Sequence, residues 1–202
     1  MKKIIIISFC FFVIALHAME QQSHELFIDF AQEKHIPAIT TLSDEVWDDF
    51  FKPTMIREYS DYPPEAIQEF FDTADIVFEE LFKKATSNIE NNKDRIVIAS
   101  TNKESDNLLG LCAFTKQENL LFINYLIVSQ QLRGKGIGKA LLSKALSTYN
   151  DVTVCKLVTL ARGNSATQAF YEKLGFTSTK ELCGGLPCMP NTHFLYELAI
   201  KK

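Results

Sequence analysis

The chain has 202 residues, of which 47% are hydrophobic and 11% aromatic, and its formal net charge is −4. This length is typical of one domain, and the apolar fraction is enough for a sizeable core. The net acidic charge argues against a nucleic-acid-binding protein, which usually shows an excess or stripe of basic residues.

The N-terminus differs from the rest of the chain. Lys2 and Lys3 precede the apolar run Ile4–Leu16, and Ala18 follows closely. This pattern is typical of a secretory signal peptide, and the run is shorter than the roughly 20 residues of a membrane span. We expect residues 1–18 to be a signal peptide and the mature protein to be exported, with no stable membrane span after cleavage. A cytoplasmic protein and an uncleaved membrane anchor are the alternatives.

The next elements are predicted from caps, prolines and apolar spacing. Residues 19–35 are polar and are expected to form a linker or irregular segment, followed by one domain over 36–202. Ile36–Leu42 suggests a first strand, which Pro37 would confine to a sheet edge. A helix is expected from Ser43 onward, interrupted at Pro53.

Further elements follow in chain order. A second helix is predicted from Pro63-Pro64, because apolar side chains then recur every 3.6 residues as far as Ala85. The remaining pattern predicts strands at 95–101, 108–115, 120–128, 153–160, 176–180 and 193–200, helices at about 136–149 and from Asn164, and a loop at 183–192. This order indicates a mixed α/β sheet with flanking helices.

A glycine-rich loop follows the strand 120–128. Gly134, Gly136 and Gly138 alternate with basic residues and lead into a helix, where backbone N–H groups and the helix dipole favour an anion such as pyrophosphate. The segment departs from the nucleotide-triphosphate loop, because Ala140 follows Lys139, and from the dinucleotide fingerprint, which needs Gly-x-Gly-x-x-Gly. Arg133, Gly136 and Gly138 instead fill the pattern Arg/Gln-x-x-Gly-x-Gly/Ala.

This third pattern resembles the acyl-coenzyme A pyrophosphate loop of the GNAT superfamily of N-acetyltransferases. A second segment supports the resemblance: Asn164, then Phe170-Tyr171, then Gly175-Phe176 is similar to the family's other signature. The resemblance is specific from about 94 to 200, and Thr167 departs from it where the family usually has Ala.

The resemblance implies the acyl-CoA N-acyltransferase fold, a mixed, mostly antiparallel twisted sheet with flanking helices. It implies acetyl-CoA as co-substrate and a primary amine of a small molecule or peptide as acceptor. The strand 120–128 would separate from its parallel neighbour, and its backbone would hold the pantetheine arm. The implied cofactor-binding residues are Leu126, Ile127, Val128, Arg133, Gly134, Lys135, Gly136, Ile137, Gly138, Lys139 and Asn164.

The catalytic chemistry is assigned only in part. Tyr171 matches the family tyrosine that faces the coenzyme sulfur, and it would protonate the leaving thiolate. Asn164 is expected to cap its helix and contact the cofactor arm. Asn124 and Tyr125 stand where many members carry a glutamate, which leaves Glu118, His193 or a water as candidate bases. A non-catalytic acyl-CoA sensor or interaction module is the alternative function.

The cysteines indicate no metal site. Cys112 and Cys155 lie in apolar strand segments and are expected to be small core residues. Cys183 and Cys188 flank a Gly-Gly-Leu-Pro turn. They could pair in an oxidising compartment or stay reduced, and their spacing without matching histidines argues against zinc.

Overall fold

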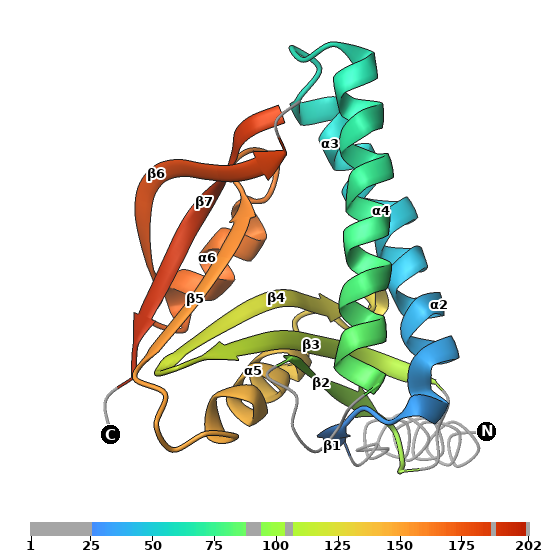
Figure 1. Ribbon diagram of the computed structural model, residues 1–202, viewed down its shortest axis with the longest axis vertical. Coiled ribbons are helices and arrows are strands. Elements are labelled where there is room, and N and C mark those ends of the chain that lie inside the picture. The colour runs from blue at the N-terminus through green and yellow to red at the C-terminus, as the bar shows by residue number, and fades with distance from the viewer. Residues whose placement is uncertain (1–25, 88–93, 104–106, 187–188, 201–202) are drawn as a thin grey trace, which may run out of the picture.

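The computed structural model describes residues 26–87, 94–103, 107–186 and 189–200. They form a seven-stranded sheet in the order β1-β2-β3-β4-β5-β7-β6, with helices on both faces (Figure 1). All neighbouring strands are antiparallel except β4 and β5, which are parallel. The predicted mixed, mostly antiparallel sheet is confirmed. The predicted leader, residues 1–18, lies outside the described residues.

The first half of the sheet is a meander. Its strands are β1 (Phe27–Phe30), β2 (Asp94–Ser100), β3 (Leu108–Gln117) and β4 (Leu120–Val128). The hairpins of β2 with β3 and of β3 with β4 were expected from the sequence. β1 was not, because four residues are too few to show a period in a polar segment. Part of the segment 19–35 is therefore a regular edge strand paired with β2.

The predicted strand Ile36–Leu42 is wrong, because these residues lie in a helix. A 3₁₀ turn, η1 (Glu33–His35), leads into α2 (Ile36–Val46). Pro37 stands in the first turn, where a backbone N–H has no partner within the helix in any case. The Thr40 hydroxyl donates to the Ile36 carbonyl at 3.1 Å and the Thr41 hydroxyl to the Pro37 carbonyl at 3.0 Å, so both β-branched residues are accommodated.

The helix also continues past Pro53. A π-helical turn, η2 (Trp47–Phe51), joins α2 to α3 (Lys52–Glu58), and the Lys52 N–H donates to the Trp47 carbonyl five residues back. Pro53 lies in the first turn of α3, so it starts a helix and does not interrupt one. The predicted second helix is confirmed as α4 (Pro64–Ser87). α2 and α4 lie over the same face of the sheet in Figure 1.

The second half contains the helices that the two signatures predict. Its elements are η3 (Gln130–Leu132), α5 (Ile137–Ser147), β5 (Val154–Leu160), α6 (Ser165–Lys173), β6 (Thr177–Leu186) and β7 (Met189–Ala199). α5 and α6 lie behind the sheet in the view of Figure 1, opposite α4. The predicted loop 183–192 is mostly wrong, because β6 and β7 continue pairing as far as Leu186 and Met189.

Three apolar clusters hold these layers together. The largest joins α5 and α6 to the sheet through residues such as Leu141, Tyr171 and Cys155. A second joins α2 to β2, β3 and β4. The third joins α3 and α4 to the ends of β5 and β7 around Met55 and Leu160. α5 packs against β2, β3 and β4 and α6 against β6, whereas α4 and the largest cluster reach both halves of the sheet, which meet at β4 and β5.

Candidate active site

The central strands β4 and β5 separate along their length. They pair from Leu120–Val154 to Ile123–Leu157, and beyond these pairs 125–128 pair only with β3 while 158–160 pair only with β7. Figure 1 shows the two halves of the sheet diverging from this point. Backbone N–H and C=O groups on the facing edges can therefore bind an extended chain. This geometry agrees with what the family resemblance implies for 120–128.

A β-bulge marks the start of this separation. In the β3–β4 ladder Phe114 pairs with Ile123 and Ala113 with Tyr125, so Asn124 is one residue extra on β4. The Asn124 side-chain amide donates to the Thr115 hydroxyl at 2.8 Å. Burial raises the pKa of Tyr125 to about 12. Neither residue can take up a proton near neutral pH, so β4 supplies no side-chain base at the bulge.

The glycine-rich loop lies at the end of β4 towards which the strands diverge. Gly134 has φ +79° and Gly136 has φ +84°, a left-handed conformation that glycine adopts without strain. A Cβ atom on either residue would meet nothing within 4 Å, so the backbone is open to a ligand. Gly136 is the N-cap of α5, whose first N–H groups, including those of Ile137 and Gly138, have no acceptor within the helix. These features suit an anion.

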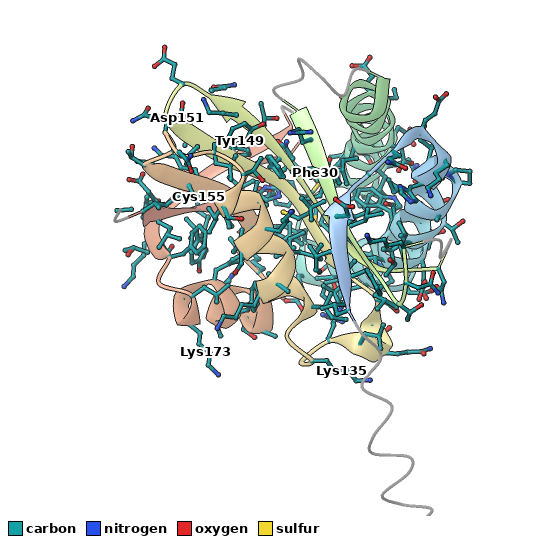
Figure 2. The ribbon with its side chains drawn as sticks, turned by 90° about the horizontal axis from the view of Figure 1, so that it is seen from below. Phe30, Lys135, Tyr149, Asp151, Cys155 and Lys173 are labelled. Atoms are coloured by element: carbon teal, nitrogen blue, oxygen red, sulfur yellow. The ribbon has the colours of Figure 1, made fainter. Side chains whose placement is uncertain are left out.

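The cations of the loop point in different directions. The Arg133 Nε donates to the Val128 carbonyl at 3.4 Å, and its guanidinium carbon lies 4.6 Å from the centre of the Phe50 ring. Lys135 and Lys139 are exposed, and Figure 2 shows Lys135 at the edge of the molecule. The lysines are thus available to a ligand in solvent, while Arg133 is turned back towards β4 and η2.

Tyr171 is buried beneath the sheet, with 6% of its surface exposed. Its ring contacts Phe170, Phe176 and Tyr196 at centroid distances of 5.1, 5.6 and 6.1 Å. Burial, and after it the nearby thiols of Cys112 and Cys155, raise the pKa of Tyr171 well above its ordinary value. The hydroxyl therefore keeps its proton at neutral pH, as a general acid must before the reaction. Figure 2 shows Cys155 on the neighbouring strand β5.

Asn164 lies beyond the end of β5, across the separation from β4. It occupies the N-cap position of α6, but its side chain makes no capping bond. The side-chain amide of Asn164 donates instead to the Thr159 hydroxyl at 2.7 Å, and the backbone carbonyl of Asn164 accepts from the Gln168 N–H at 3.0 Å. The expected side-chain cap is therefore wrong: the amide nitrogen is bonded to a hydroxyl on β5, and the side-chain oxygen accepts no N–H of the first turn. Asn164 still places a polar group beside the end of β5.

The candidate bases differ in position. Glu118 lies in the exposed turn between β3 and β4, six residues and roughly 20 Å of extended chain from the bulge at Asn124. His193 lies on β7 opposite Leu160, and its Nδ1 is 2.9 Å from the Thr192 hydroxyl oxygen. Burial lowers the pKa of His193 to about 4. Of these two, His193 is a neutral imidazole, and it lies on the half of the sheet that contains β5.

A polar junction that the sequence does not predict ties α3 to the β5–α6 loop. The Tyr59 hydroxyl donates to the Thr192 carbonyl at 2.8 Å and accepts the Arg162 N–H at 3.2 Å. The Arg162 guanidinium donates to Asp61 at 2.7 Å and to the Glu58 carbonyl at 3.2 Å. These partners are more than 100 residues apart in the sequence, so no local pattern announces them.

The described residues contain neither a metal site nor a membrane-spanning helix. Cys112 and Cys155 are free and buried, and burial raises both thiol pKa values. Cys188 lies outside the described residues, so a disulfide with Cys183 and two free thiols both stay open. No group of three or more His, Cys, Asp or Glu side chains in the described part of the chain could hold a metal ion. Among the same residues, no helix is both long and apolar enough to cross a membrane.

Comparisons with known proteins agree with this geometry. The model of the acetyltransferase (GNAT) family matches residues 39–176. No curated protein matches significantly. The fold is similar to that of the PaiA N-acetyltransferase from Thermoplasma acidophilum in complex with coenzyme A, with a TM-score of 0.61 and 19% identity over 87% of this chain and 99% of that one.

An acetyltransferase from Streptococcus agalactiae is similar at a TM-score of 0.59, with 15% identity over 87% of this chain and 98% of that one. At these identities the structures support the fold alone. The family model spans more than half of the sequence, and the chain therefore belongs to the acetyltransferase (GNAT) family, whose members use acetyl-CoA as co-substrate.

Proposed function

We propose that this protein is an N-acetyltransferase that moves the acetyl group of acetyl-CoA to a primary amine of a small molecule or peptide. The observation that carries the proposal is the position of the glycine-rich loop at the end of the unpaired edge of β4. The edge of β4 that faces away from β3 after Ile123 leads directly into the loop 133–139 at the N-terminus of α5. An extended amide chain on the strand would therefore have its phosphate end at the helix N-terminus.

The chain's own residues would then divide the work. Backbone groups of Leu126 to Val128 orient the arm of the co-substrate, and the loop holds its pyrophosphate. A neutral amine attacks the thioester carbonyl, the carbon–sulfur bond breaks, and the thiolate leaves. Tyr171 is protonated at neutral pH, and we assign it the donation of that proton to the thiolate. His193 is neutral at the same pH, but its lowered pKa makes it a weak base, so a water is the alternative acceptor of the ammonium proton.

A non-catalytic acyl-CoA-binding module is the second candidate. It is favoured by the bulge, where Asn124 is bonded to Thr115 and no carboxylate is available to deprotonate an amine. A sensor needs only the cofactor contacts, and these depend on the same strand and loop. The two functions therefore predict the same binding and differ only in turnover.

One pair of measurements tests the proposal. Acetyl-CoA at millimolar concentration should raise the melting temperature, because a ligand that binds only the native state stabilises it by mass action. A panel of small and peptidyl amines should then release free thiol at a rate that depends on amine concentration. Binding without release across the panel would select the sensor, and a folded protein with no thermal shift would exclude both.

The export of the mature protein is proposed on the leader sequence alone. It predicts that mass spectrometry of the protein made in its own cells finds a mature N-terminus near Met19, outside the cytoplasm. An intact Met1 on cytoplasmic protein would overturn this part of the proposal.

A further inference from the structure

The π-helical turn η2 brings an aromatic ring to the coenzyme loop. Phe50 and Phe51 are neighbours in the chain but face different directions, because successive residues of a helix are about 100° apart around its axis. Phe51 stacks on Trp47 at 4.5 Å and on Phe70 at 6.2 Å, within the core beneath α4. Phe50 instead lies against the Arg133 guanidinium, 4.6 Å from its carbon to the ring centre. π-turns occur frequently at functional sites.

Arg133 is held from two sides. Its Nε donates to the Val128 carbonyl, the last residue of β4, and its planar guanidinium covers the Phe50 ring. The Arg133 backbone N–H also donates to the Gln130 carbonyl at 3.3 Å. The first residue of the loop is thereby fixed between the end of a strand and a helix 80 residues earlier in the chain. The exposed residues Gly134 to Gly136 follow immediately, and a Cβ on either glycine would meet nothing within 4 Å.

We propose that Phe50 is a positioning residue for the coenzyme loop, acting through the cation–π contact with Arg133. The contact holds the start of the loop in place, so that its backbone N–H groups are arranged for a pyrophosphate before the ligand arrives. A loop ordered in advance loses less conformational freedom on binding. The inference rests on the proposed binding of acetyl-CoA by this loop. It assigns Arg133 a bracing role rather than a direct contact with the phosphates.

The expected effect is small and specific. A cation–π contact at an exposed site accounts for about a two- to fivefold change in an equilibrium constant. Phe50→Leu should therefore weaken coenzyme A binding about two- to fivefold in isothermal titration calorimetry, and Phe50→Tyr, which keeps the ring, should restore it. Phe51→Leu is the matched control: it removes an adjacent ring that does not contact Arg133, so it should lower the melting temperature and leave the dissociation constant unchanged.

A double-mutant cycle tests whether the effect passes through Arg133. Phe50→Leu and Arg133→Gln should each weaken binding, and the double variant should be no weaker than Arg133→Gln alone. Additive losses of affinity in the double variant would overturn the inference. A loss of affinity above tenfold for Arg133→Gln with no loss for Phe50→Leu would also overturn it, since Arg133 would then contact the phosphates itself.

Hydrogen exchange in the ligand-free protein keeps this inference separate from the proposed function. Phe50→Leu should speed exchange of the amides at 133–139, whereas Phe51→Leu should not. If wild-type protein bound no coenzyme A, the proposed function would fail, while faster exchange in Phe50→Leu would still support the positioning role of Phe50. If the wild type bound coenzyme A and Phe50→Leu changed neither the affinity nor the exchange rates, only the positioning role of Phe50 would be refuted.

Discussion

Replacing Gly136 with glutamate separates the fold from the cofactor site. Gly136 has φ +84° and ψ −4°, and a Cβ there would meet no atom within 4 Å. The folded state therefore suffers no clash, only the strain of an L-residue in a left-handed conformation, about 1–2 kcal/mol. For a protein of this size that corresponds to a fall in melting temperature of about 2–8 °C.

The effect of Gly136→Glu on binding should be much larger. The new carboxylate would stand at the N-terminus of α5, where the pyrophosphate is proposed to lie. Two like charges about 5 Å apart at an effective dielectric constant near 20 repel by roughly 3 kcal/mol, which is on the order of a 100-fold loss of affinity. Calorimetric titration with coenzyme A measures this loss, and urea unfolding measures the strain.

Two further variants at the same position isolate the cause. Gly136→Ala carries the backbone strain alone, and Gly136→Gln adds the bulk of glutamate without its charge. We expect the three variants to lose similar stability and the glutamate variant to bind far more weakly than the glutamine variant. Equal affinities for the glutamate and glutamine variants would show that no phosphate lies beside Gly136, and the placement of the cofactor on this loop would be wrong.

Three other residues give sharp expectations. Tyr171→Phe should lower kcat by about 10²–10⁴ with coenzyme A affinity unchanged, and a wild-type rate across the pH range would make Tyr171 a packing residue. The pKa of His193 is about 4 in the folded state and near 6.5 in the unfolded state. The unfolding free energy of the wild type, measured with urea, should therefore fall by up to about 3 kcal/mol as the pH is lowered from about 6.5 to about 4. A similar fall in His193→Gln would contradict this. Tyr59→Phe leaves the Thr192 carbonyl and Arg162 N–H without this partner and should cost about 1–3 kcal/mol of unfolding free energy, whereas unchanged stability would show that the junction is not needed.

The sequence predicts the second half of the fold best, for a physical reason. The glycine loop needs left-handed residues at fixed positions, and the helices after it carry their own apolar spacing, so local residues determine local structure there. α5, β5 and α6 are accordingly found close to their expected bounds. The positions of Gly134 and Gly136 at positive φ follow from the same constraint.

The first half is predicted less well because its structure depends on distant contacts. The sequence suggested a strand at Ile36–Leu42, confined to an edge by Pro37, but Ile39 and Leu42 pack against β2, β3 and β4 as one face of a helix. Tertiary packing thus outweighs local propensity. The same limit applies to the site: Phe50, Tyr59 and Arg162 carry no motif, and only the folded chain brings Phe50 to Arg133 and Tyr59 to Arg162.

The separation of β4 from β5 also affects how stability depends on ligand. The ladder between β4 and β5 ends at Ile123 and Leu157, so the sheet has an internal edge as well as its two outer ones. An extended ligand in that position adds sheet hydrogen bonds that the protein alone does not make, and ligand occupancy and resistance to unfolding become one equilibrium. At a ligand concentration 100 times Kd the gain is about 2.7 kcal/mol. A substitution that only weakens binding would therefore lower the abundance of the protein in a cell, and would be mistaken there for a folding defect.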